Sequence, residues 1–205
     1  EITFLHEDSY THVYKEIGSY TIKGHFTFGS NYAPSASLSQ CITKVNYLAK
    51  DTSDLNQAFK YCKFLKSANL ESLKITNLAD TFYDCQSLDT VSFTGSTFAN
   101  LTNMKNLFNG CSKLRELDLT VINTANVTDM SYLFNKCTSL ATLNISNWST
   151  EKVTNMRNMF ADCKLLISLD LSHFKTDLVK NMSEMFKDCS ALENINTTGW
   201  STSEV

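Results

Sequence analysis

The feature that most constrains this chain is a repeat with a fixed period. Cys85, Cys111, Cys137, Cys163 and Cys189 follow one another at intervals of 26 residues. A phenylalanine stands three residues before each of these cysteines and a leucine three residues after it. The phenylalanines are Phe82, Phe108, Phe134, Phe160 and Phe186. A fixed period of this length predicts a solenoid, in which each unit stacks only on its neighbours.

Each unit divides into two halves with different periodicities. In the first half, apolar residues such as Met104, Phe108 and Cys111 have the spacing of one stripe on a helix, so we expect a short helix there. In the second half, Leu117 and Leu119 show the two-residue alternation of a strand. Stacking predicts an α/β solenoid, a leucine-rich-repeat-like stack of strand, loop and short helix with a parallel β-sheet on one face.

The repeats define one expected domain, residues 51–205. Regular copies occupy 99–205 and two irregular copies occupy 51–98. Val205 is in register with Val179, so the last copy is truncated in mid-repeat. We therefore expect the natural protein to continue with further copies or a cap, because an open apolar face must be covered.

One irregular copy is shorter than the others. Cys62 precedes Cys85 by only 23 residues. We expect Leu70, Leu73 and Ile75 to form a strand displaced along the sequence, with a shortened loop behind it.

Residues 1–50 lack the repeat and are expected to form an N-terminal β cap over the first turn of the solenoid. Apolar and polar residues alternate over 20–28, which indicates a strand. Residues 12–17 are its expected hairpin partner. Residues 41–48 are a candidate degenerate first coil.

Six of the seven cysteines occupy the same repeat position, the exception being Cys41. A zinc site needs ligands that converge on one point, whereas a repeat column spreads them along the solenoid axis. Neighbouring copies lie about 4.8 Å apart in a stack, which also leaves disulfides open as an alternative. We expect reduced thiols that act as small buried apolar groups, with no metal and no cofactor.

Composition excludes several classes of partner. A net charge of −3 argues against nucleic acid and anionic membranes, which a basic stripe would bind. The hydrophobic share of 42% and the charged share of 19% are typical of a folded chain. No apolar run approaches the roughly 20 residues needed to span a bilayer, so direct membrane insertion is not expected.

The repeat pattern N-M-x-x-M-F-x-x-C-x-x-L-x-x-L-D-L-S-x-F-x-T, with V-T-N-M opening the unit, resembles the BspA-like leucine-rich repeat surface proteins. The resemblance is to the branch with units of about 25–26 residues. It covers residues 99–205, with weaker matches back to 51. It implies a solenoid on a secreted or surface-anchored protein, with roles in adhesion and in binding host or matrix proteins.

Outward residues of the strands are the candidate binding residues, because side chains alternate between the two faces of a strand. The face is flat, polar and slightly acidic, which suits hydrogen bonding to a protein or glycan. A solvated face without a ligand is the competing interpretation. The candidates are Thr90, Ser92, Glu116, Asp118, Thr142, Asn144, Ser168, Asp170, Asn194 and Asn196.

No catalytic constellation is expected. The four histidines, His6, His12, His25 and His173, are scattered along the chain. Asp118 and Asp170 share one column but stand two copies apart, about 10 Å by strand spacing. We therefore expect a non-enzymatic protein.

These observations favour a cell-surface or secreted recognition module. Its expected partner is a protein or glycan on a host, on the matrix or on a neighbouring cell, bound through the outward face of the sheet. The alternative is a structural stalk or spacer that presents another domain. The sequence does not indicate an oligomeric state.

Overall fold

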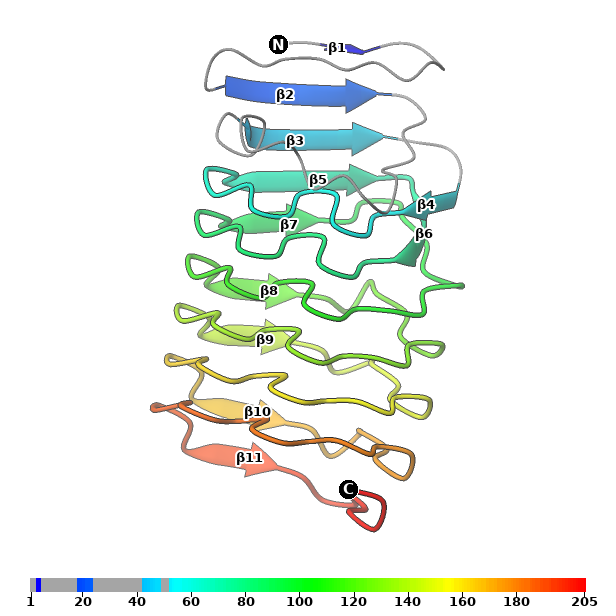
Figure 1. Cartoon of the computed structure of the whole chain (residues 1–205), viewed down its shortest axis with the longest axis vertical. Helices are drawn as coiled ribbons and strands as arrows, with labels where there is room; N and C mark the ends of the chain where they lie inside the picture. The colour runs from blue at the N-terminus through cyan, green and yellow to red at the C-terminus, as the bar shows by residue number, and fades with distance from the viewer. Residues whose placement is uncertain (1–2, 5–17, 24–41, 49–51) are drawn as a thin grey trace.

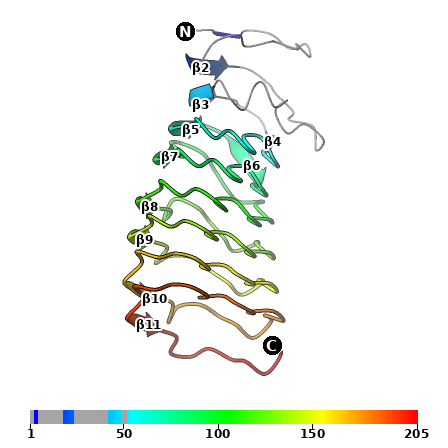
Figure 2. The same ribbon diagram turned by 60° about the vertical axis from the view of Figure 1, so that its left-hand side comes forward.

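The structure, a computed structural model, describes residues 3–4, 18–23, 42–48 and 52–205. They form a parallel β-solenoid of about six turns, each of which we call a coil (Figure 1). The coils stack along the long axis, and most of the strands line one side of the stack (Figure 2).

The strands are short and every pairing among them is parallel. One sheet has the order β1 (Thr3–Phe4), β2 (Gly18–Lys23), β3 (Ile42–Leu48), β5 (Ser67–Glu71) and β7 (Thr90–Ser92). Farther along the stack, β8 (Glu116–Asp118) pairs with β9 (Thr142–Asn144), and β10 (Ser168–Asp170) pairs with β11 (Asn194–Asn196). A separate pair joins β4 (Thr52–Asp54) to β6 (Lys74–Asn77).

The register of the strands reproduces the period of the sequence. Leu117 in β8 lies opposite Leu143 in β9, and Leu169 in β10 lies opposite Ile195 in β11. Each repeat position therefore forms a column along the solenoid. The solenoid and its parallel sheet agree with the prediction, whereas the α/β class depended on short helices.

The described part of the N-terminal region extends the same parallel sheet. β2 pairs with β1 on one side and with β3 on the other, and β3 continues to β5. Residues 12–17, the expected hairpin partner, lie outside the described residues.

In the short copy, strand β5 keeps its register with the following coil, so it is not displaced along the sequence as expected. The copy is shortened after this strand. Ser67 in β5 lies opposite Thr90, and Lys74 forms a bridge to Thr97. The next bridge joins Asn77 to Asn103, so the three missing residues fall between Lys74 and Asn77, where the following coil has a longer segment between Thr97 and Asn103.

The short helices expected between the methionine and cysteine positions were wrong, because none of the described residues is helical. The segment 104–111 is a series of turns. The amide of Leu107 donates to the carbonyl of Met104 at 3.2 Å, and that of Cys111 donates to Phe108 at 3.0 Å. These bonds connect residues three apart, whereas an α-helix connects residues four apart.

Left-handed backbone at two positions in each coil prevents a helix. The third residue of each turn has a positive φ, as at Asn106 (56°) and Gly110 (82°). An L-residue in an α-helix needs a negative φ. The other residues at these two positions are Gln57, Tyr61, Asp80, Asp84, Tyr132, Lys136, Asn158, Asp162, Glu184 and Asp188.

The amides between these turns connect neighbouring coils. Asn106 donates to the carbonyl of Ser131 at 2.9 Å, and Phe108 donates to that of Leu133 at 3.0 Å. We call this side of the solenoid the turn wall. It comprises residues 55–65, 78–88, 104–114, 130–140, 156–166 and 182–192. These segments run in front of the strands in Figure 1.

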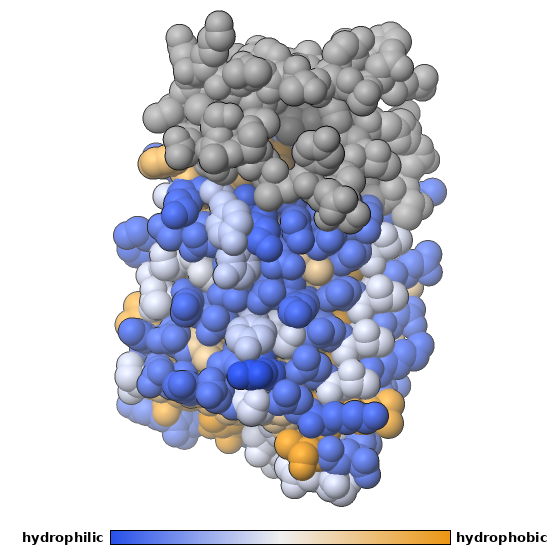
Figure 3. Space-filling view, in the orientation of Figure 1, coloured by the Kyte–Doolittle hydropathy of each residue, from blue (hydrophilic) through white to orange (hydrophobic). Residues whose placement is uncertain are grey.

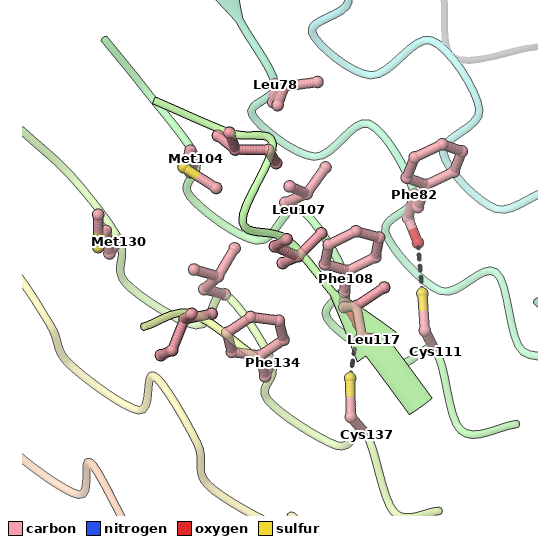
Figure 4. Packing of buried hydrophobic residues seen from close by; sticks show 14 of the residues in the cluster. Leu78, Phe82, Met104, Leu107, Phe108, Cys111, Leu117, Met130, Phe134 and Cys137 are labelled. Atoms are coloured by element: carbon pink, nitrogen blue, oxygen red, sulfur yellow. Dashed lines mark hydrogen bonds between the residues drawn. The ribbon is translucent and has the colours of Figure 1, made fainter. Parts of the chain in front are cut away.

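The core is built from columns of identical side chains. Phenylalanines of adjacent coils stack with ring centroids 5.5 to 6.0 Å apart and nearly parallel planes (Figure 4). At this separation offset rings attract each other in addition to burying apolar area. The column comprises Phe59, Phe82, Phe108, Phe134, Phe160 and Phe186.

The cysteines form a second column beside the phenylalanines. The thiol of Cys111 donates to the carbonyl of Phe82 at 3.1 Å, and that of Cys137 donates to Phe108 at 3.2 Å (Figure 4). Cys85, Cys163 and Cys189 make the same bond to the preceding coil. A cysteine therefore fills a small apolar space and adds a weak hydrogen bond between coils.

Threonine hydroxyls tie the corners after β8, β9 and β10 to the next coil. The hydroxyl of Thr150 donates to the carbonyl of Lys175 at 2.8 Å and accepts from its amide at 2.7 Å. Thr124 and Thr176 make the same pair of bonds to the next coil. At these corners, outside the strands, the buried hydroxyls take the place of backbone hydrogen bonds between coils.

Candidate functional site

All ten predicted binding residues are exposed on the outward side of the strands, which we call the sheet face. They form two columns that flank the inward leucines. The first column contains Thr90, Glu116, Thr142, Ser168 and Asn194. The second column contains Ser92, Asp118, Asn144, Asp170 and Asn196.

Side chains of the second column close turns at the ends of the strands. A carboxylate oxygen of Asp118 accepts from the amide of Thr120 at 3.0 Å and from its hydroxyl at 2.8 Å. Asn196 accepts from the same two groups of Thr198. Asp and Asn favour this local bond to the backbone two residues on. This column therefore has a structural role in addition to any contact with a partner.

The alternation of Asp and Asn along the second column also reduces charge repulsion. The amide and hydroxyl of Thr120 lower the pKa of Asp118, and the side chain of Asn144 in the next coil lowers it further. Ser172 lowers the pKa of Asp170 in the same way, with smaller contributions from His173 and Asn196. The carboxylates are thus held ionised and are separated by an amide.

The first column is free to contact a partner. The side chains of Glu116, Thr142, Ser168 and Asn194 make no hydrogen bond or ion pair with any residue that the structure describes. Within each strand pair they stand in register, with Glu116 opposite Thr142 and Ser168 opposite Asn194. Sequence alternation predicts the exposure of both columns, but it does not separate the bonded column from the free one.

The buried thiols are poor nucleophiles. Burial raises the pKa of Cys62 to about 12 and raises the pKa of Cys111 and Cys137 well above the ordinary value. The thiolate is the reactive form of cysteine, so these groups remain protonated near neutral pH. All six cysteines of the described chain are free thiols. Within the same residues, no three His, Cys, Asp or Glu side chains converge as metal ligands do.

The turn wall contains two shallow hollows that sequence reasoning missed. The larger has a volume of about 420 Å³ and is lined by Tyr83, Tyr132, Lys105, Lys136 and three asparagines. The smaller, of about 260 Å³, is lined by residues of both charges that include Arg157 and Glu184. The face seen in Figure 3, in the orientation of Figure 1, is largely hydrophilic.

Differences between neighbouring coils create the larger hollow. Asn106 and Gly110 stand where the next coil carries Tyr132 and Lys136. The smaller side chains leave a gap between taller neighbours. In the sequence, the hollow is signalled by a change of residue type from one copy to the next at positions between the repeated Met, Phe and Cys. A search for repeated positions does not examine such changes.

Among the described residues no helix is long and apolar enough to cross a membrane. The stacked coils, the parallel strands and the Phe and Cys columns define a parallel β-solenoid repeat protein. A family model described as "Mycoplasma protein of unknown function, DUF285" matches residues 51–166 and 102–205. The chain therefore belongs to this family. No curated protein sequence matches it.

A solved structure with some likeness is a leucine rich cell surface protein from Faecalibacterium prausnitzii A2-165. It is 15% identical, and the match covers 95% of this chain and 86% of that chain with a TM-score of 0.22. A superposition of this quality supports no inference about function.

Proposed function

We propose that this chain is a non-enzymatic recognition module, secreted or held at a cell surface. It binds a protein or glycan on a host, on the matrix or on a neighbouring cell through the sheet face. The observation that carries the proposal is the first column, a row of exposed polar side chains without partners on a rigid support. The resemblance to the BspA-like leucine-rich repeat surface proteins supports the adhesive role and the location.

A second candidate function is that of a structural stalk or spacer. The continuous core favours it, because the same Phe, Cys and Leu columns run through all the regular coils. A solenoid of this kind gains length by adding copies and needs no ligand.

Three lysine substitutions in the first column test the recognition function. Glu116→Lys, Thr142→Lys and Ser168→Lys together place three positive charges on the sheet face and leave the turns of Asp118 and Asp170 intact. We expect the triple variant to bind matrix proteins and cultured cells at least about tenfold more weakly, because charge mismatch disfavours the contact. Surface plasmon resonance and cell-binding assays measure this.

The control places the same number of lysines in another exposed column, with a total charge change of +3 against +4 in the first-column variant. Thr102→Lys, Thr128→Lys and Thr154→Lys introduce lysine at a position where the last coil already carries Lys180. This variant should bind as the parent does. Equal binding by parent and first-column variant would exclude the sheet face, and absence of binding to every surface tested would favour the spacer.

A further inference from the structure

We propose that the larger hollow of the turn wall binds a saccharide that carries a carboxylate group. The site is lined by Lys105, Lys136, Tyr83, Tyr132 and three asparagines. It lies on a different side of the solenoid from the sheet face, so it does not depend on the recognition function proposed above.

The two lysines of the hollow differ from most other lysines on the turn wall, among which only Lys113 also has no acidic partner within the described residues. Lys60 pairs with Asp80 at 3.3 Å, Lys63 with Asp84 at 3.8 Å, and Lys187 with Glu184 at 3.6 Å. Lys105 and Lys136 have no acidic partner among the described residues. An exposed ammonium group without a partner is available to an anion, and two such groups face one hollow.

The three asparagines that line the hollow are joined in a chain of side-chain hydrogen bonds. Asn135 donates to Asn109 at 3.0 Å, Asn109 donates to Asn106 at 3.0 Å, and Asn106 donates to Asp80 at 3.2 Å. These bonds fix the orientation of each amide. An amide has two N–H groups and two acceptor sites, so each keeps capacity to bond a ligand hydroxyl without reorganising.

The two tyrosines add aromatic rings to the lining, and the Lys60 ammonium lies 4.9 Å from the ring centroid of Tyr83. Tyr83 and Tyr132 are half-buried, and the guanidinium of Arg157 lies 5.9 Å from the ring centroid of Tyr132 on the side of the smaller hollow. An aromatic ring combines an apolar face with a polar edge, which suits the C–H face and the hydroxyls of a pyranose ring. Tyrosines, amides and cations in an open hollow together match a sugar acid.

Charges around the hollow argue against a polyanion such as nucleic acid. Asp80 and Asp84 lie beside it on the preceding coil, and the whole chain has a net charge of −3. Nucleic-acid binding depends on many cationic contacts to phosphates. Two lysines are enough for one or two carboxylates.

Calorimetric titration with defined probes tests the proposal. The probes are sialyllactose and a hyaluronan tetrasaccharide as acidic saccharides, lactose as the neutral saccharide, and a thymidine homo-oligonucleotide. We expect at least one acidic saccharide to bind and lactose to bind at least about tenfold more weakly, because a charge-assisted bond is lost. Equal affinity for sialyllactose and lactose, binding of the oligonucleotide alone, or no binding of either acidic probe would overturn the proposal.

Two variants locate the site. Lys105→Gln with Lys136→Gln should weaken the acidic saccharide at least about tenfold, whereas Lys175→Gln with Lys180→Gln, exposed lysines outside the hollow, should leave it unchanged. Asn106→Tyr fills the hollow with the residue found at the equivalent position of the next coil, where Tyr132 has the same backbone conformation (φ 57° against 56°). Thermal unfolding verifies the fold, and undiminished binding by the folded Asn106→Tyr variant would place the ligand elsewhere.

Discussion

At the scale of single residues, two buried hydroxyls of one coil differ in how they are satisfied. Thr150 makes two hydrogen bonds to the backbone of Lys175, whereas the hydroxyl of Ser131 has no partner. Both side chains are 1% exposed. A buried polar group stabilises the fold only when its bonding capacity is used.

This difference predicts opposite effects of removing the hydroxyl. Thr150→Val keeps the shape of the side chain but leaves the amide and carbonyl of Lys175 without partners, so the free energy of unfolding should fall by about 1–3 kcal/mol. Ser131→Ala removes an unbonded hydroxyl and should leave stability unchanged or raise it by up to about 1 kcal/mol. Urea denaturation measures both, and a larger loss in Ser131→Ala than in Thr150→Val would contradict the assignment.

The thiols predict an order of chemical modification. Cys189 is partly exposed, whereas Cys111 and Cys137 are fully buried. Iodoacetamide under native conditions should alkylate Cys189 before Cys111 and Cys137, and should reach those two buried thiols only through unfolding. Peptide mass spectrometry reads out each site, and addition of urea should abolish the order. Early labelling of Cys111 would show that the column opens locally.

At the scale of elements, the turn wall shows why the sequence pattern was ambiguous. Met104, Leu107, Phe108 and Cys111 are all buried, as a helical stripe would be. Consecutive turns place residues three and four apart on the inside as well, so spacing alone cannot separate the two structures. The left-handed positions, where Asn, Asp and Gly are frequent, hold the distinguishing signal.

The two faces of the strands could be predicted from the sequence, whereas the hollow on the turn wall could not. The inward Leu117 and the outward Asp118 follow directly from two-residue alternation. The hollow beside Lys105 depends on how one coil differs from the next, because Asn106 stands where Tyr132 follows. A repeat pattern describes what the copies share, so it is silent about features made by their differences.

Left-handed positions predict the response to glycine and to β-branched residues. Lys136 has a φ of 59° and makes no ion pair within the described structure. Lys136→Gly should raise the free energy of unfolding by up to about 1 kcal/mol, because left-handed backbone strains an L-residue by roughly that amount. Lys136→Ile should lower it. Urea midpoints compare both variants with the parent. If Lys136→Ile were more stable than Lys136→Gly, the turn would adopt another conformation.

At the scale of the whole molecule, each coil contacts only its neighbours, so stability should follow coil number. Deletion of residues 127–152 removes one 26-residue period and joins Asn126 to Val153, which stands in the register of Val127. We expect a folded protein with lower stability and a smaller denaturant slope, which scales with the area exposed on unfolding. Deletion of 127–139 breaks the register and should abolish folding. Circular dichroism measures the folded content of the two deletion variants. If both were equally unfolded, the stacked arrangement would be contradicted.

The buried thiols also make global stability depend on alkaline pH. Burial raises the pKa of Cys111 and Cys137 above the ordinary value of 9.0. Above that value the unfolded chain releases thiol protons that the native chain keeps, so the free energy of unfolding should fall by up to about 1.4 kcal/mol per pH unit for each thiol. Urea midpoints on either side of this value measure the decline, and Cys111→Ala with Cys137→Ala should make it shallower.

The hydrogen bonds between coils have a mechanical consequence. They run along the long axis of the stack, from Asn106 to Ser131 and from Phe108 to Leu133. A pull on the two ends therefore loads one junction at a time and peels off single coils. Each freed period of 26 residues extends by up to roughly 90 Å at about 3.3–3.6 Å per residue. Force spectroscopy would record steps of about one period each, so the folded stack lengthens in stages under load instead of unfolding at once.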